Sequence, residues 1–154
     1  MTTVWFLRSP GNYRQRRVRM DKQTVALVQE SWAKVVPISA TAGALFYTNL
    51  FEAAPSLKAL FKGDMGAQAT KLMQMITAAV GKLNELDELV PVLQQLGKRH
   101  SGYGVLPGHY TVVGASLLKT LEQGLGPAFT PATKEAWTAV YGVMAKVMTE
   151  AAAS

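Results

Sequence analysis

Residues 89–105 read LVPVLQQLGKRHSGYGV, and this stretch decides how the rest of the chain is interpreted. Three leucines and one histidine recur at helical spacing and share one face of the predicted helix: Leu89, Leu93, Leu96 and His100. Gly102, Gly104 and Pro107 predict that this helix ends within a few residues of His100. The imidazole therefore lies beside a break in the helix, where a flat ligand could enter. The alternative, from the residues alone, is a core histidine that bonds a neighbouring carbonyl.

The composition indicates one domain with a large core. The chain has 154 residues, of which 49% are hydrophobic and 17% are charged, and this length is typical of a single domain. It contains no cysteine and two histidines. A disulfide framework and a thiolate metal site are therefore excluded, a zinc cluster is not expected, and a reducing cytoplasm is the expected compartment.

The positive charge is concentrated at the N-terminus. The formal net charge is +6, but five of the sixteen basic residues and none of the ten acidic residues precede residue 20. The remainder, with eleven basic and ten acidic residues, is close to neutral. We expect residues 1–19 to form a basic, disordered extension and residues 20–154 to form the folded domain. The alternative for the extension is a patch that binds phosphate or anionic lipid.

The sequence predicts neither an export signal nor a membrane span. Residues 4–7 are too short for a secretory apolar segment, and Arg16-Arg17 is not followed by a hydrophobic run. The longest uncharged stretches, residues 35–51 and 100–118, are interrupted by proline, glycine, serine or histidine. We expect a soluble protein with neither a membrane nor a nucleic acid as its partner.

Apolar periodicity predicts helices throughout the folded part, so the predicted fold class is all-α. Apart from the histidine helix, the predicted helices cover residues 21–36, 38–53, 65–83, 108–125 and 131–149, with a short turn at 57–61 and a charged loop at 84–88. Asp21 or its predecessor begins the first helix, and Thr130 is the predicted N-cap of the last, with Pro131 at the first helical position. No strand or internal repeat competes with this interpretation.

Two segments resemble those of a known family. Leu96-Gly97-Lys98-Arg99-His100 resembles the segment of globins that carries the proximal histidine, and residues 125–133 resemble the same region of neuroglobins. The similarity covers about residues 20–150. It implies a globin fold, in which helices enclose a haem pocket, with haem b as the cofactor. It also implies that His100 bonds the haem iron and that Phe61 packs on the porphyrin.

The same resemblance assigns the remaining residues of the pocket. Tyr47 and Gln68 match the two polar distal positions of bacterial single-domain globins and flavohaemoglobins, whereas neuroglobins have a histidine at the position of Gln68. The other assigned haem contacts are Leu72 and Ile76 as an apolar wall, Lys71 and Arg99 beside the propionates, and Leu96, Val105 and Tyr110. Hydrogen-bonded core residues are the alternative for Tyr47 and Gln68, and a solvated helix face is the alternative for Lys71 and Arg99.

The proximal side departs from the flavohaemoglobin pattern. Tyr110 matches a tyrosine that polarises the ligand histidine there, but the matching glutamate position falls near Ala152, with Glu150 as the nearest acid. The chain has no G-x-G-x-x-G motif and no room for a reductase, so turnover would need an external electron donor.

Three functions remain open at this point. The first is tight, reversible binding of O2, with NO and CO as further ligands and oxygen transport as the associated role. The second is an NO dioxygenase that detoxifies nitric oxide with a separate reductase. The third is a haem-free helical sensor domain.

Overall fold

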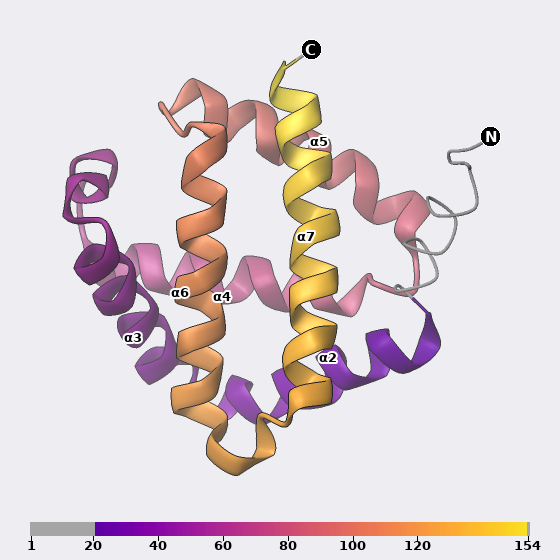
Figure 1. Cartoon of the computed structure of the whole chain (residues 1–154). Helices are drawn as coiled ribbons and strands as arrows, with labels where there is room; N and C mark the ends of the chain where they lie inside the picture. Colours follow the sequence, from indigo (N-terminus) through magenta and orange to yellow (C-terminus); the bar gives the residue numbers. More distant parts are fainter. Residues whose placement is uncertain (1–20, 154) are drawn as a thin grey trace.

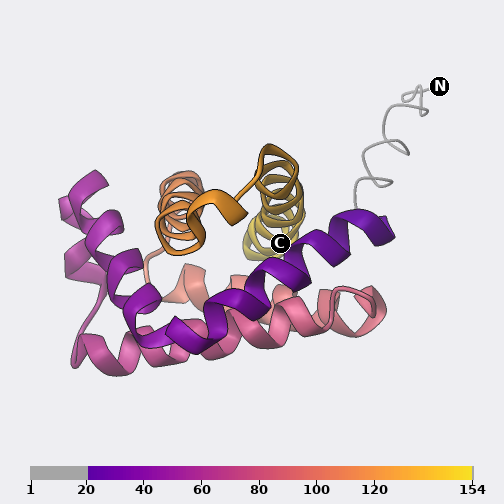
Figure 2. The same ribbon diagram turned by 90° about the horizontal axis from the view of Figure 1, so that it is seen from below.

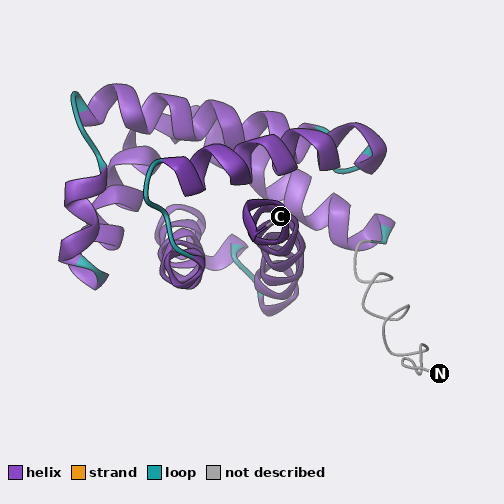
Figure 3. Ribbon diagram, turned by 90° about the horizontal axis from the view of Figure 1, so that it is seen from above, coloured by secondary structure: helices purple, strands orange, loops and turns teal. Residues whose placement is uncertain are grey.

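The computed structural model describes residues 21–153, and all of its regular structure is helical (Figure 3). Six α-helices carry the fold: α2 (Lys22–Val35), α3 (Ser39–Ala53), α4 (Met65–Gly81), α5 (Leu86–Gly102), α6 (Pro107–Leu125) and α7 (Pro131–Ala153). Three short 3₁₀ turns join them: η1 (Val36–Ile38), η2 (Pro55–Leu60) and η3 (Gly126–Ala128). The predicted all-α class is confirmed. The extension predicted for residues 1–19 lies outside the described part of the chain.

The helices cross one another in two layers. Helices α6 and α7 lie side by side, and α2, α4 and α5 cross behind them (Figures 1 and 2). Helix α5 packs chiefly against α7, α3 packs against both α6 and α4, and α2 packs against α7. Helices α4 and α5 leave a common turn and diverge from it, so that α6 and α7 cross both of them (Figure 1). No helix in the described range is long and apolar enough to cross a membrane.

Side-chain oxygens cap three of the helix starts. The backbone N–H of Thr24 donates to Asp21 Oδ1 at 2.9 Å, and that of Gly66 donates to Asp64 Oδ1 at 3.0 Å. The N–H of Thr133 donates to Thr130 Oγ1 at 3.2 Å. These bonds satisfy donors that the first turn of a helix leaves without an intrahelical acceptor. The predicted N-cap at Thr130 is confirmed. Asp21, which the sequence placed at the start of the first helix or directly after it, is the N-cap of that helix.

Several predicted boundaries are wrong. Residues 86–88, assigned to a charged loop, form the first turn of α5, because Asp87 and Glu88 favour the positive end of the helix. Helix α4 ends at Gly81, two residues before the predicted end, and η2 begins at Pro55. Helix α7 continues to Ala153 instead of ending at residue 149, because residues 151–153 are alanines, the strongest helix formers.

Buried side chains join α2, the first described helix, to α7, the last. Trp137 is fully buried, its ring centroid lies 5.7 Å from that of Trp32, and its indole N–H donates to Ser31 Oγ at 2.8 Å. The amide of Asn49, also buried, donates to Thr120 Oγ1 at 3.0 Å and joins α3 to α6. These buried polar groups have partners, as stable cores require.

Helix α5 approaches the backbone of α7 more closely than a side chain would allow. A Cβ atom on Gly97 would lie 2.7 Å from the Cα atom of Met148, and it would also overlap the carbonyl oxygen of that residue. Because the opposing atoms are backbone, they cannot turn aside as a flexible side chain can. Gly97 therefore sets the distance between the two helices, three residues before His100.

Gly97→Ala is expected to destabilise the protein by about 2 kcal/mol, because an extra methyl group in a closely packed contact costs roughly 1–3 kcal/mol. The matched control is Gly142→Ala on α7, where a Cβ atom would meet nothing within 4 Å and alanine should gain roughly 1 kcal/mol of helix propensity. Urea unfolding of both variants measures the difference. Equal stability of the two variants would refute the packing role of Gly97.

Candidate functional site

His100 lies in the last turn of α5 with one ring nitrogen already bonded. Its Nδ1 atom lies 2.8 Å from the carbonyl oxygen of Leu96. A carbonyl can only accept, so Nδ1 carries a proton and donates it, and in a neutral imidazole the lone pair is then on Nε2. Nε2 makes no hydrogen bond to any residue that the structure describes, and the residue is half-buried. A neutral imidazole held in this way is a metal ligand with its tautomer already fixed.

No other metal ligands surround this nitrogen. Among residues 21–153 there is no group of three or more histidine, cysteine, aspartate or glutamate side chains that could hold an ion. His100 therefore belongs to no such group within residues 21–153.

Several apolar side chains on the helices around α5 are only half-buried. They pack against the core on one side and come from three helices: Leu72 and Ile76 of α4, Tyr110 and Val113 of α6, and Met144 and Val147 of α7. Leu96, one turn before His100, is buried, and Val105 donates its N–H to the carbonyl of His100 at 3.0 Å. The half-buried residues leave apolar surface available to a hydrophobic ligand.

The structure brings Tyr47 and Phe61 together. Their ring centroids lie 5.2 Å apart, with the rings nearly perpendicular at 75°, and Phe51 packs on both of them. Tyr47 is 8% exposed, and its hydroxyl makes no hydrogen bond within the described part of the chain. Burial raises the pKa of Tyr47 above that of an ordinary tyrosine, about 10. The hydroxyl therefore stays protonated at neutral pH and is available as a donor.

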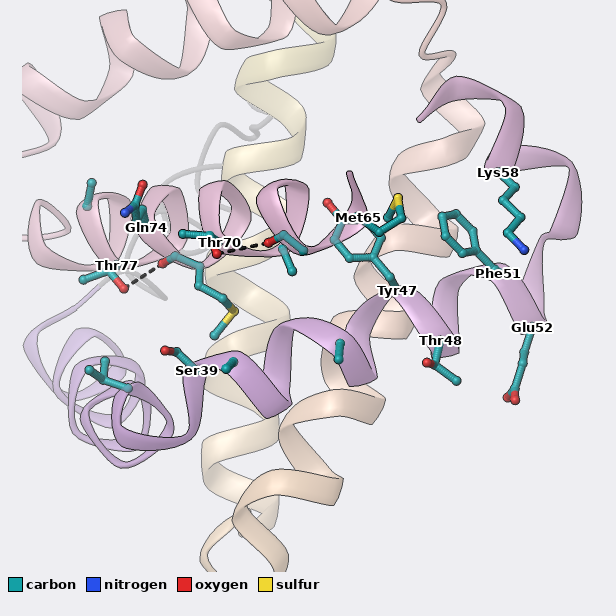
Figure 4. Close-up of a pocket in the computed structure, with 17 residues that line it drawn as sticks. Ser39, Tyr47, Thr48, Phe51, Glu52, Lys58, Met65, Thr70, Gln74 and Thr77 are labelled. Atoms are coloured by element: carbon teal, nitrogen blue, oxygen red, sulfur yellow. Dashed lines mark hydrogen bonds between the residues drawn. The ribbon is translucent and has the colours of Figure 1, made fainter. Parts of the chain in front are cut away.

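Gln68 is not joined to Tyr47. Its Nε2 atom lies 3.4 Å from the carbonyl oxygen of Lys62, which is a long hydrogen bond. Gln68, Leu72 and Ile76 share one half-buried face of α4, as the spacing predicts. Tyr47 instead borders a groove of about 1060 Å³ between α3 and the neighbouring face of α4. In Figure 4, Tyr47 and Phe51 project from α3 toward Met65 at the start of α4.

The two basic residues assigned to the rim are exposed. Lys71 lies on α4 and Arg99 lies on α5 directly before His100. Neither makes an ion pair with a described residue, since Lys82–Glu88 is the ion pair found in that range. Both remain available to an anionic group.

Tyr110 has a buried hydroxyl without a partner. No hydrogen-bond acceptor or donor in the described range reaches its Oη atom, and burial raises its pKa. Glu150 is exposed and Ala152 carries no acid, so no carboxylate reaches this tyrosine. Within residues 21–153, no acid therefore lies beside Tyr110 as the flavohaemoglobin pattern would predict.

Tyr141 fixes the backbone around Tyr110, and the sequence interpretation missed it. Its hydroxyl donates to the carbonyl oxygen of Tyr110 at 2.6 Å. Its ring occupies the space beside Gly114, where a Cβ atom would lie 2.6 Å from the ring. Burial raises the pKa of Tyr141, and the neighbouring Tyr110 raises it further. Tyr110 and Tyr141 are far apart in the sequence, so no local sequence pattern predicts their contact.

His109, the second histidine of the chain, lies near the start of α6 and has a local role there. Its Nδ1 atom accepts the N–H of Leu106 at 3.0 Å, which caps the start of α6. The ring is half-buried and lies outside the stripe that ends at His100.

Tyr110→Phe is expected to leave stability unchanged or raise it by about 1 kcal/mol, because a buried hydroxyl without a partner costs roughly 1–3 kcal/mol. The control is Tyr141→Phe, which removes a made hydrogen bond and should cost about 1 kcal/mol. Thermal or urea unfolding distinguishes them. A loss of stability in Tyr110→Phe as large as that in Tyr141→Phe would show that its hydroxyl has a partner.

Comparison with known proteins gives matches at three levels. The family model described as Globin matches residues 44–148. A zebrafish (Danio rerio) neuroglobin is 32% identical over 145 residues, which cover 85% of this chain and 91% of that protein. A flavohemoprotein of Bacillus subtilis is 30% identical over 129 residues, which cover 82% of this chain and 32% of that protein.

A solved structure agrees in fold. A hexacoordinated heme protein from an anhydrobiotic tardigrade superposes with a TM-score of 0.79 at 17% identity, over 86% of this chain and 95% of that one. The chain thus spans nearly the whole of the neuroglobin and of the tardigrade protein, and about a third of the flavohemoprotein.

Proposed function

The chain belongs to the globin family, and from this premise we propose that it binds haem through His100 and holds O2 and other diatomic ligands with high affinity. The observation that carries the proposal is the bond between His100 Nδ1 and the Leu96 carbonyl, which leaves the Nε2 lone pair unshared. Tyr47 and Gln68 are the proposed distal residues. Reversible ligand binding is the proposed activity, with oxygen transport as the associated role.

The residues present fit a haem. The prosthetic group brings four nitrogen ligands of its own, which suits a site with one histidine and no cluster of other ligands. Its apolar plane suits the half-buried side chains of α4, α6 and α7. Its two carboxylates suit Lys71 and Arg99, which are exposed and basic. Since the chain has no cysteine for covalent attachment, we propose haem b.

A ferrous haem, when bound, supplies reversible coordination of diatomic ligands. The chain supplies the surroundings in which a ligand is held. Tyr47 keeps its proton on Oη and offers it as a hydrogen-bond donor, and a donor in a water-poor site acts more strongly than one in bulk water. Leu72 and Ile76 limit the access of water. The amide of Gln68 becomes a second donor once it turns away from Lys62.

We infer a pentacoordinate ferrous state in this chain. The tardigrade neighbour is called hexacoordinated, but α4 carries no histidine that could serve as a sixth ligand beside Leu72 and Ile76. The second histidine of the chain, His109, caps α6. The two histidines of the chain would thus supply one iron ligand, His100, and external molecules would bind the iron as further ligands.

An NO dioxygenase is the second candidate, favoured by the similarity to a flavohemoprotein. The matched residues cover about a third of that relative, so turnover would need electrons supplied from outside the residues of this chain. Because no carboxylate contacts Tyr110 in the described range, we favour ligand binding over efficient turnover.

The absence of cysteine is consistent with the cytoplasm as the proposed location.

An absorption spectrum of the purified protein tests the proposal. We expect haem to copurify or to bind on reconstitution, a five-coordinate ferrous spectrum after reduction, and a distinct spectrum after addition of CO. Failure to retain haem would favour the haem-free sensor domain. A six-coordinate ferrous spectrum would contradict the assignment of the distal side. Faster NO consumption with an added reductase than without one would favour the dioxygenase.

A further inference from the structure

The basic residues of the folded domain are concentrated in two segments. Residues 53–84 and 89–121 contain seven of the eleven lysines and arginines between residues 20 and 154, and one of the ten acids. These segments include η2, α4 and most of α5 and α6. The rest of the domain has four basic residues and nine acids. The domain is therefore close to neutral as a whole but carries its charge unevenly.

The turn between α5 and α6 brings the two basic segments together. Gly104 lies in this turn with φ +93°, and a Cβ atom on it would lie 3.5 Å from Leu60 Cδ2 of η2. Two lysines flank Leu60 in the sequence, and two basic residues precede the turn on α5. We call these four exposed residues the basic collar: Lys58, Lys62, Lys98 and Arg99.

No acid is paired with the basic collar in the described part of the chain. None of its four members forms an ion pair there. The carboxylate of Asp64, the acid closest to it in the sequence, accepts the N–H of Gly66 at 3.0 Å and caps α4. Glu52 and Lys58 line the same groove but form no ion pair with each other. The charge of the collar is therefore available to an anionic partner.

The same turn carries the two most exposed large hydrophobic residues in the described range. Tyr103 is 67% exposed and Leu106 is 61% exposed. The ring centroid of Tyr103 lies 6.3 Å from that of His100. Protein interfaces typically have an apolar centre, in which tyrosine is common, and a polar rim. A molecule that docks on this turn would therefore come close to His100.

The shape of this surface favours a protein partner over a lipid bilayer. Helices that lie in a membrane surface present a long apolar face, whereas Tyr103 and Leu106 lie on a short turn. Complexes between proteins that exchange electrons bury small interfaces, below about 1,200 Å². Opposite charges raise the rate of such encounters and fix the orientation of the partners.

We propose that the basic collar, with Tyr103 and Leu106 at its centre, is the docking surface for an acidic electron-carrier protein. The inference rests on the proposed function, because it requires a haem held by His100. The partner is a protein with a reduced flavin. The flavin gives up one electron and the ferric iron takes it up, and no bond forms or breaks. Such a partner would supply the external electrons that the NO dioxygenase needs.

An NMR titration with flavodoxin, a small acidic protein that carries FMN, tests the surface without depending on haem. We expect the amide signals of residues 58–62 and 98–106 to shift at low salt and to return as the salt concentration rises. Signals of α2 should not shift. Cytochrome c, a basic protein, should cause no shifts. Absence of shifts with flavodoxin, or equal shifts with cytochrome c, would overturn the proposal, as would stronger binding to phosphatidylserine vesicles than to flavodoxin.

Charge reversal separates the collar from the general charge of the protein. The test variant changes the collar lysines, which are not proposed haem contacts: Lys58→Glu, Lys62→Glu and Lys98→Glu. The control variant makes the same change in net charge at exposed lysines outside both basic segments: Lys22→Glu, Lys34→Glu and Lys134→Glu. At low salt, reduced flavodoxin should reduce the ferric, haem-loaded test variant about tenfold more slowly than the wild type, and the control variant within about twofold of it. Equal rates in the two variants would overturn the docking surface.

Failure of the docking surface and failure of the proposed function give different results. If the protein retained no haem, the proposed function would fail, whereas the NMR titration would still decide whether flavodoxin binds at the collar. If haem and O2 bind as expected but the two charge variants are reduced at equal rates, the docking surface is wrong and the role of His100 stands. The O2 release rate should be unchanged in both variants.

Discussion

His100→Ala is expected to abolish retention of haem or weaken it severely, while His109→Ala keeps the full haem content. His100 is the residue with a free Nε2 lone pair at the end of the apolar stripe, whereas His109 uses its ring to cap α6. The loss of that cap should cost His109→Ala about 1 kcal/mol of stability without affecting the iron. Haem content and the reduced absorption spectrum of each variant are the measurements.

A ligand role for His100 is separated from a structural one by chemical rescue. Addition of imidazole to His100→Gly should restore haem binding if the side chain acts as the iron ligand. Circular dichroism should show that the helices of the variant persist, because the bond from Nδ1 to Leu96 is a single contact near the end of α5. Unchanged five-coordinate ferrous bands in His100→Ala would exclude it as the ligand.

Tyr47→Phe is expected to accelerate O2 release by roughly ten- to a hundredfold. A hydrogen bond to a charged acceptor contributes ~1.5–3 kcal/mol, and each 1.4 kcal/mol corresponds to about a factor of ten. Phenylalanine keeps the ring contacts with Phe61 and Phe51 and removes only the hydroxyl. The stability of the fold should therefore change little. Stopped-flow displacement of O2 measures the release rate.

Gln68→Leu is the matched comparison for Tyr47→Phe. Its effect on O2 release should be smaller, since an amide is a weaker donor than a phenol and the Gln68 amide is directed toward Lys62. CO, which takes up less negative charge, should respond less than O2 in both variants. Non-additive effects in the double variant would show that the two side chains share one network. An unchanged O2 release rate in Tyr47→Phe would show that Tyr47 serves only to pack the core. The main support for tight O2 binding would then be lost.

The elements of this fold were predictable because their signals are local. Apolar spacing of three and four residues, together with caps at Asp21 and Thr130, predicted six helices in the right order. The wrong predictions concern the ends of helices, where the same residue types are favourable both in a loop and in the first or last turn of a helix. Asp87 and Glu88 resemble a polar loop, but at the start of a helix the same charges are favourable.

The assignment of the candidate site residues came only from the resemblance to a family. Spacing alone placed His100 on an apolar face, and that pattern is shared by core histidines. The partner of its Nδ1 atom, four residues earlier on the same helix, is the part that the structure adds. The direction of the Gln68 amide toward Lys62 could not be predicted, because a helical pattern fixes the face of a residue and not its rotamer.

Contacts between distant segments left no signal in the sequence. Gly114 beside Tyr141 and Gly97 beside Met148 each lie where a Cβ atom would overlap the opposite helix, but a lone glycine in a helical pattern is compatible with many causes. The groove between α3 and α4 is also lined by residues that are distant in the sequence, so no local pattern predicts it.

The contact of Gly97 with the Met148 backbone also bears on how the native protein opens. Because α5 packs chiefly on α7, the hydrogen bonds of both helices near this contact should be lost in the same fluctuation. Amide protons of α5 and of the last turns of α7 should then exchange with solvent as one cooperative unit, separately from those of α2 and the first half of α7, which Trp137 holds together. The last turns of α7 would thus determine how often α5, the helix that carries His100, unfolds locally. Hydrogen exchange would show the same free energy of opening for both segments.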